Sequence, residues 1–165
     1  MEYQGGGEAA TLEPLHEHLF EYKTHMVQNY GAGVQACYRG PRLYDTPETQ
    51  AAVTEVIQWY KKYRDILNSD MIHLRRPDAR DWDGFIHVNP HKKEKGLAMF
   101  FNPTHQEITR TIHVPLYYTG LTQTARIREK EQAPTIYKLS RDYTVELTVK
   151  IPANGYTWYV VEAAD

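Results

Sequence analysis

The 165-residue sequence contains a single cysteine, Cys37, and this scarcity excludes two kinds of site. One thiol cannot form a disulfide within the chain, and without a second thiol there is no CxxC pair for metal binding or redox chemistry. Cys37 lies in the apolar run Val34–Tyr38, and no histidine stands beside it in the sequence. We therefore expect a buried, unreactive thiol rather than a nucleophile.

Long hydrophobic runs and an excess of charge of one sign are also missing. No apolar stretch approaches the ~20 residues that a membrane-spanning helix needs. Nineteen Lys and Arg residues against 21 Asp and Glu residues give a net charge of -2, which provides no field to hold a nucleic acid. Residues Met1–Gly7 lack the basic and apolar regions of a signal peptide. We expect a soluble protein whose partners include neither membrane nor nucleic acid.

Motifs for catalysis, cofactors and metals are missing as well. No GxSxG motif of a serine hydrolase occurs, and Gly5–Gly7 and Gly31–Gly33 lack the Lys-Ser/Thr ending of a phosphate-binding loop. His16, His18 and His25 look like a metal cluster, but two residues apart on a helix correspond to about 200° of rotation. No metal and no cofactor is expected.

Two amphipathic helices are predicted in residues 1–69. Apolar residues recur at helical spacing over Leu12–Tyr30, and the glycines of Gly31–Gly33 permit a left-handed helix cap. The second helix is expected to begin after Thr46, a hydroxyl N-cap followed by Pro47, and to end near Leu67. Each helix has an apolar face that must find a partner.

Residues 70–165 alternate between apolar and polar positions, which is typical of strands. Turn signals separate nearly all the candidate strands, and no helical pattern intervenes. The pattern predicts a mainly β fold, an antiparallel β-sandwich of about eight strands preceded by the two helices. The expected strands are Met71–Arg75, Phe85–Val88, Leu97–Asn102, Ile108–Val114, Ala125–Arg128, Thr135–Leu139, Thr144–Ile151 and Tyr156–Glu162.

One loop is a candidate binding site. Arg39, Arg42, Tyr44 and Asp45 surround the Gly40-Pro41 turn just before the second helix, and loops held by rigid elements commonly carry binding groups. This cluster predicts contact with a carbohydrate. An ion pair between Arg42 and Asp45 that only stabilises the turn is an equally supported alternative.

Trp82 is the fifth candidate for carbohydrate contact, because it lies among the acidic residues Asp78, Asp81 and Asp83. Glycosidase chemistry needs two carboxyl groups facing each other, which proximity in sequence does not establish. Arginines interspersed among these acids indicate an exposed, charge-paired connection instead. No catalytic residue is therefore assigned.

Exposed aromatic residues in a planar row would indicate an independent carbohydrate-binding module. The residues that could form such a row are Trp82, Tyr117, Tyr118, Tyr156, Trp158 and Tyr159. In the last strand, Tyr156, Trp158 and Val160 share one face, which we interpret as core rather than platform.

Several segments resemble the end of the chain in α-galactosidase-like glycoside hydrolases. Ala51–Pro77 is similar to the last barrel helix and exit strand of that clan, with a Tyr-Lys-x-x-Arg pattern in the helix and a proline after the strand. Gly33–Thr46 is similar in position to the final barrel strand and its loop. The other matching segments are Gly84–Val88, Gly96–Pro103 and Leu116–Leu121.

The resemblance implies a C-terminal portion of a glycoside hydrolase, comprising the last barrel helices and the accessory β-sandwich. The family places its catalytic aspartates on earlier barrel strands, and a barrel of ~250 residues does not fit here. The implied partners are a carbohydrate or the catalytic barrel of a parent chain, and a homo-oligomer would also cover the helix faces. If the parent degrades polysaccharide, the location is periplasmic or extracellular. A binding module and a small stand-alone enzyme remain the alternatives.

Overall fold

The computed structural model describes residues 12–36 and 40–164. Contacts between Cα atoms group into two compact units, residues 1–64 and residues 65–165, and each unit is described here by itself. The division between them falls inside the second helix. The domain boundary at residues 69 and 70 that the sequence pattern favours therefore stays a proposal.

The first unit contains the two predicted helices. The first begins as the 3-10 turn η2 (Leu15–His18) and continues as α1 (Leu19–Gly31). It is followed by Gly33 at a φ of 70°, in the left-handed region that glycine permits. The helix α2 (Pro47–Leu67) has the predicted bounds, and its last residues belong to the second unit.

Contacts show that α1 and α2 run in the same direction. Lys23 Nζ lies 2.6 Å from Glu55 Oε2, and further along both helices the rings of Tyr30 and Tyr60 stack with centroids 4.6 Å apart. Parallel neighbouring helices need a connecting segment that returns along their length, and residues 32–46 separate α1 from α2 in the sequence. This is the connectivity of consecutive helices in a β/α arrangement.

The start of α2 is fixed by a reciprocal cap. The N–H of Thr49 donates to Thr46 Oγ1 (3.3 Å), and the N–H of Thr46 donates to Thr49 Oγ1 (3.0 Å). Threonine here takes the place of the Glu or Gln of a capping box, so two otherwise unsatisfied N–H groups are paired. The predicted N-cap at Thr46 is confirmed.

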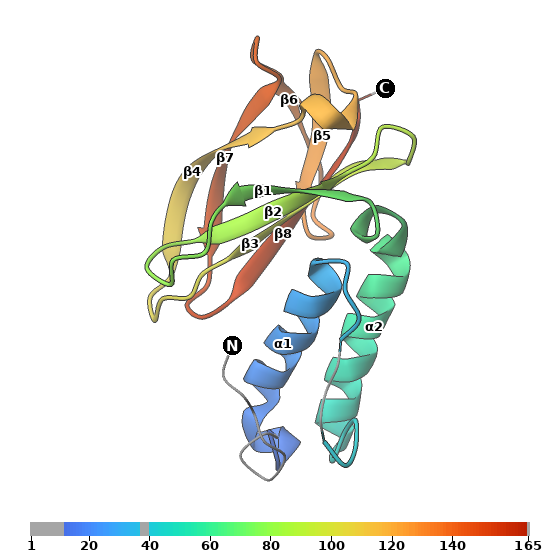
Figure 1. Cartoon of the computed structure of the whole chain (residues 1–165), viewed down its shortest axis with the longest axis vertical. Helices are drawn as coiled ribbons and strands as arrows, with labels where there is room; N and C mark the ends of the chain where they lie inside the picture. Colours follow the sequence, from blue (N-terminus) through green and yellow to red (C-terminus); the bar gives the residue numbers. More distant parts are fainter. Residues whose placement is uncertain (1–11, 37–39, 165) are drawn as a thin grey trace. The chain divides into compact units, whose positions relative to one another are not determined.

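The second unit is the predicted antiparallel β-sandwich (Figure 1). One sheet has six strands in the order β1-β2-β3-β8-β5-β6, and the other has two, β4-β7. All eight strands lie where the alternating pattern predicts them, within a few residues at each end. They are β1 (Asp70–Arg75), β2 (Asp83–Val88), β3 (Glu94–Phe101), β4 (Ile108–Pro115), β5 (Thr124–Glu129), β6 (Thr135–Lys138), β7 (Thr144–Ile151) and β8 (Tyr156–Ala163).

The core lies between the two sheets. Strand β7 shows the alternation most clearly, since Val145, Leu147, Val149 and Ile151 are buried while the residues between them are half-buried or exposed. These side chains meet apolar residues of the six-stranded sheet, Phe100 among them. Burial of apolar area at about 25 cal/mol per Å² is the main stabilising contribution.

The prediction that the face of β8 shared by Trp158 and Val160 is core rather than platform is confirmed, because both side chains are buried, although the cluster between the sheets takes the other face. Tyr159 and Val161 belong to the core cluster between the sheets, whereas Trp158 and Val160 lie on the opposite face. Trp158 and Val160 are nevertheless buried. A strand that is buried on both faces reads as a continuous apolar run, so its sequence cannot show which face lies inside.

A buried asparagine joins two of the four places where the chain crosses between sheets, the β3–β4 and β7–β8 connections. Asn102 follows β3, and its side-chain amide donates to the carbonyls of Ile151 (3.2 Å), the last residue of β7, and Pro152 (2.9 Å), which follows it. It also donates to Gln106 O (2.8 Å), while its own Oδ1 accepts from the N–H of Thr104 (2.9 Å). One side chain therefore fixes both crossovers.

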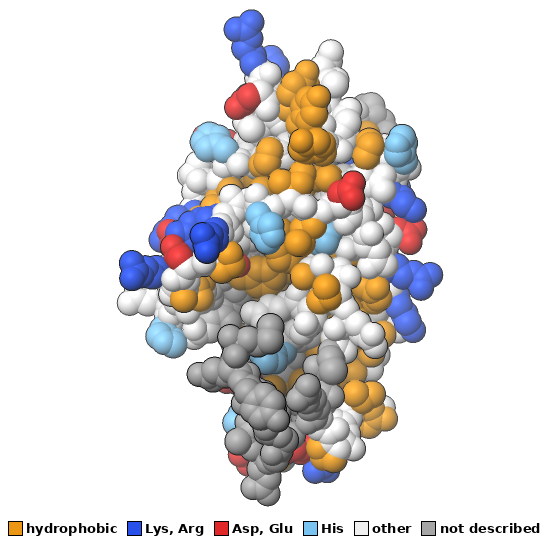
Figure 2. All heavy atoms as spheres, viewed as in Figure 1, with side chains coloured by type: hydrophobic (Ala, Val, Ile, Leu, Met, Phe, Trp, Pro, Cys, Tyr) orange, Lys and Arg blue, Asp and Glu red, His pale blue; other side chains and the backbone are white. Residues whose placement is uncertain are grey.

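Charges of both signs are distributed over the surface. On the face that Figure 2 shows, Lys and Arg side chains lie among Asp and Glu side chains of the described residues. Among those same residues, no helix is both long enough and apolar enough to cross a membrane.

We predict that Asn102→Ala lowers the free energy of unfolding by about 3 kcal/mol, because three carbonyls lose a donor in a buried place. Asn89→Ala is the matched control. Asn89 also precedes a proline and accepts from the N–H two residues on, but its amide bonds only to Ser69 Oγ. The control is expected to cost about 1 kcal/mol. Equal losses in urea unfolding would contradict the bridging role.

Candidate functional site

The loop before α2 holds the predicted carbohydrate contacts in the helical unit. Arg42, Tyr44 and Asp45 are described, whereas Arg39 and Cys37 lie outside the described residues. The backbone of the loop is anchored by Tyr22, a buried tyrosine of α1 whose hydroxyl donates to Leu43 O (2.9 Å). Rigid elements therefore hold this loop, as the sequence argument requires of a binding loop.

Arg42 does not pair with Asp45, which corrects the structural alternative. Its Nε donates to Glu13 Oε1 (3.2 Å), and a terminal guanidinium nitrogen lies 3.2 Å from Glu13 Oε2. The Arg42 side chain is 54% exposed, so the pair contributes little to stability. The guanidinium remains open to solvent on one side.

Asp45 instead joins the loop to the start of the first helix. Its Oδ2 accepts from the backbone N–H of His16 (3.1 Å) and lies 2.8 Å from His16 Nδ1, while Oδ1 accepts from Thr49 Oγ1 (3.0 Å). Desolvation opposes ionisation of this carboxyl, but the hydrogen bonds from His16 and Thr49 outweigh it and lower the pKa of Asp45 to about 2. Asp45 is thus a structural carboxylate.

The Tyr44 side chain is 46% exposed, next to Leu43, which is 61% exposed. Arg42, Leu43 and Tyr44 are thus consecutive residues with exposed side chains. An aromatic ring beside a guanidinium suits a ligand that offers both C–H faces and hydroxyls. Within the loop, Arg42 and Tyr44 have exposed side chains and Asp45 does not, and their contact with a carbohydrate stays a prediction.

Trp82 belongs to the β-sandwich unit, so the structure describes it apart from the loop. Its ring packs edge-on against Phe100 of the core, with centroids 5.8 Å apart, and the Arg75 guanidinium lies 5.9 Å from the ring. Arg75 also donates to the Trp82 carbonyl. These contacts give Trp82 a packing role, and its contact with a carbohydrate stays a prediction.

Two of the three acidic residues around Trp82, Asp78 and Asp81, form the charge-paired connection that the sequence indicates. Arg75 pairs with Asp78 at 2.6 Å, and Arg110 pairs with Asp81 at 3.1 Å. The hydrogen bond from Arg75 lowers the pKa of Asp78. Desolvation opposes ionisation of Asp81, but its hydrogen bonds, including that from Arg110, lower its pKa. Both groups are held ionised and are unsuited to act as a general acid.

Sequence reasoning missed the residues that hold the loop, namely Glu13, His16 and Thr49. His16 was considered only as a metal ligand, and among residues 12–36 and 40–164 no three His, Cys, Asp or Glu side chains gather as a metal site requires. The Thr46-x-x-Thr49 spacing was the one available signal. No sequence feature indicates the Glu13–Arg42 pair.

Comparison of the sequence with protein families gives no match, and comparison with curated proteins gives none either. Solved structures do resemble this chain. The α-galactosidase I of Mortierella vinacea matches with a TM-score of 0.56 and 13% identity over 86% of this chain. A GH27 β-L-arabinopyranosidase of Geobacillus stearothermophilus matches with a TM-score of 0.60 and 11% identity over 88% of this chain. An α-amylase of Geobacillus thermoleovorans matches with a TM-score of 0.58 and 14% identity over 89% of this chain.

The chain spans about a third of each of these proteins, 35%, 31% and 34% of their lengths respectively. The expected likeness to part of a glycoside hydrolase is confirmed at the level of the fold. Helices followed by a β-sandwich therefore recur, at low sequence identity, as one portion of longer carbohydrate-active enzymes.

Our first prediction for the loop is that Arg42→Ala changes the free energy of unfolding by no more than ~0.5 kcal/mol, because the Arg42–Glu13 pair is exposed. A thermal melt measures the stability, and affinity electrophoresis in a polysaccharide gel measures binding. Weaker binding with unchanged stability is expected if Arg42 contacts carbohydrate. A large drop in melting temperature with unchanged binding would contradict the predicted contact.

The second prediction concerns pH. The pKa of Asp45 is about 2 in the folded chain, below its ordinary value of 3.8, so its stabilising contribution is complete above about pH 4. It is lost as the pH falls from about 4 to about 2. Asp45→Asn should therefore be less stable than the natural chain near neutral pH, and this difference should shrink across that interval. A difference independent of pH in urea unfolding would exclude the proposed linkage.

Proposed function

We propose that this chain acts as a non-catalytic C-terminal accessory domain of a glycoside hydrolase and contributes sugar contacts. The observation that carries the proposal is the partial overlap with three different hydrolases, in which 86–89% of this chain matches about a third of each enzyme. A part common to enzymes acting on different sugars fits a supporting role better than a role in bond cleavage.

The helical unit supports this proposal through its connectivity. Parallel helices joined by a returning segment are what a β/α barrel requires, because each helix of a barrel is followed by a strand that runs back. The unit also exposes large apolar side chains, among them Phe20 (54%), Val34 (53%) and Leu43 (61%). Such surface is the kind that a catalytic barrel, or a second copy of the chain, would cover.

The alternative is an independent carbohydrate-binding module with an aromatic platform. Of the aromatic candidates, Tyr117 and Tyr118 are each 62% exposed. Their rings are perpendicular, with an interplanar angle of 89°, and Tyr143 meets Tyr117 edge-on at 75°. A flat sugar chain stacks on coplanar rings, so this arrangement favours the accessory role over a platform module.

We predict that the purified chain hydrolyses aryl α- and β-glycosides no faster than background, because Asp78 and Asp81, two of the three acids near Trp82, are paired with arginines. Release of the aryl group is measured by absorbance across a panel of glycosides. Turnover that a single Asp or Glu substitution abolishes would overturn the accessory role. Asp81→Asn and Asp83→Asn are the first variants to separate such turnover from a contaminating enzyme.

A further inference from the structure

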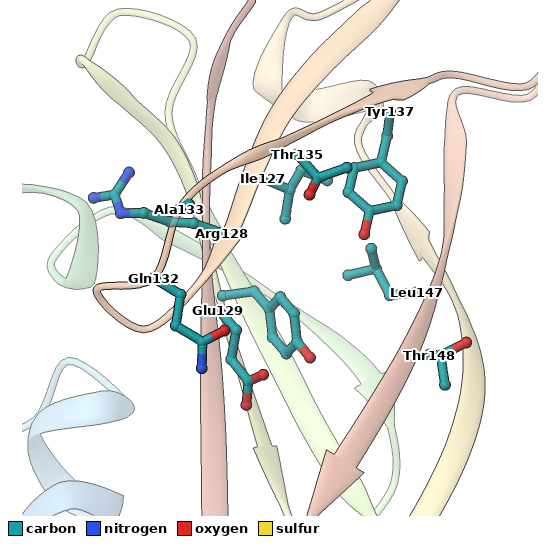
Figure 3. A pocket seen from close by; sticks show the side chains of 10 residues that line it. Ile127, Arg128, Glu129, Gln132, Ala133, Thr135, Tyr137, Leu147 and Thr148 are labelled. Atoms are coloured by element: carbon teal, nitrogen blue, oxygen red, sulfur yellow. The ribbon is translucent and has the colours of Figure 1, made fainter.

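A small polar pocket opens at the edge of the sandwich, between β6 of one sheet and β7 of the other (Figure 3). Its volume of about 180 Å³ corresponds to about six waters of liquid. The side chains that carry polar groups into its lining are Glu129, Gln132, Thr135, Tyr137, Thr148 and Tyr159. The pocket lies wholly within the second unit and away from the Arg42 loop in sequence.

Glu129 breaks the pattern of its strand. Along β5, Ala125 and Ile127 are buried in the core between the sheets, and alternation places Glu129 on the same face. Arg128 occupies the opposite face, where its guanidinium pairs with Glu162 at 3.1 Å, and Figure 3 shows it directed away from the other labelled side chains. An acid at an inward position of a sandwich strand is a local exception, and such exceptions gather at functional sites.

Hydroxyl groups hold the Glu129 carboxylate in place. Thr157 Oγ1 donates to Glu129 Oε1 at 2.5 Å, and Tyr159, directly opposite Glu129 in the β5–β8 register, also hydrogen-bonds to it. Burial, reinforced by the Glu129 charge, raises the pKa of the Tyr159 hydroxyl, so it remains a donor at any physiological pH. A carboxylate has about four acceptor positions, which leaves room for two further donors from a ligand.

The chemistry of the lining selects among ligands. A carboxylate disfavours anions, and an apolar ligand would leave several polar groups without partners. Gln132 lies on the turn next to Glu129, its backbone N–H donating to Glu129 O (2.9 Å), and its amide both donates and accepts. With the Tyr137 and Tyr159 rings, the set matches a small molecule that has several neighbouring hydroxyls on an apolar ring.

We propose that this pocket binds a single pyranose-sized sugar residue, whose vicinal hydroxyls donate to Glu129 and exchange hydrogen bonds with Gln132. The choice of a sugar over other polyhydroxylated molecules rests on the proposed function. Because the ligand is small, its dissociation constant is expected to be on the order of millimolar. The site accommodates one residue or the end of a glycan, not the middle of a long chain.

The test is a ¹⁵N-correlated NMR titration of the whole chain with D-galactose, L-arabinose and D-glucose, and separately with tetramethylammonium chloride. The side-chain amide of Gln132 is a direct reporter, since its two protons give their own signals. At least one sugar should shift this signal and the backbone signals of residues 129–133 in a saturable way. Gln132→Ala should weaken that binding about tenfold. Gln123→Ala, an exposed glutamine outside the pocket, is the matched control and should leave it unchanged.

Sugar shifts that map elsewhere, or that survive Gln132→Ala and Glu129→Gln unchanged, overturn the proposal. Binding of tetramethylammonium without any sugar also overturns it, because that result assigns the carboxylate and tyrosines to a cation. The accessory role is judged separately by the hydrolysis assay. If no sugar binds in the pocket and no glycoside is hydrolysed, only the proposed sugar site is ruled out. If a sugar binds in the pocket and a glycoside is hydrolysed, only the accessory role is ruled out.

Discussion

The β-sandwich depends on two of the four connections by which the chain passes from one sheet to the other, the β3–β4 and β7–β8 connections. The two sheets share no strand, so their alignment comes from the apolar core and from these crossovers. Asn102 lies at the β3–β4 connection and donates to carbonyls at the β7–β8 connection, 49 and 50 residues later in the sequence. The backbone reinforces this link, since the N–H of Asn102 donates to Gly155 O. Apolar contacts in the core have no preferred direction, so directional hydrogen bonds such as these fix how the two sheets are aligned.

Most of the local structure was predictable because it depends on neighbours in the sequence. The hydroxyl and proline at Thr46-Pro47 define the start of α2, and the alternation on β7 defines a half-buried strand. The order of the strands was not predictable, because β8 pairs with β3 and β5, which are distant in the sequence. Which face of β8 lies between the sheets was not predictable either, since both its faces are apolar and buried.

The candidate sites show the same division. The sequence identified the loop before α2, but not that Asp45 would bond to His16 or Arg42 to Glu13, since each pair is separated by 29 residues. Glu129 was not identified, although its signal was present. Glu129 continues the alternation of Ala125 and Ile127, which places its carboxylate on the inward face. However, it is also the last residue of its strand and lies next to a turn, where a solvent-exposed acid is equally expected.

The way each carboxylate is neutralised separates structural acids from the acid of the proposed sugar pocket. Glu162 is nearly buried and is paired with Arg126 and Arg128, so further ligands have little to gain there. Among the described residues, Glu129 is held by hydroxyl groups, which orient its charge without cancelling it. A preorganised acceptor of this kind loses little freedom when a ligand binds. An accessory domain that holds one sugar residue in such a pocket can position the end of a glycan without the aromatic platform that long polysaccharide chains require.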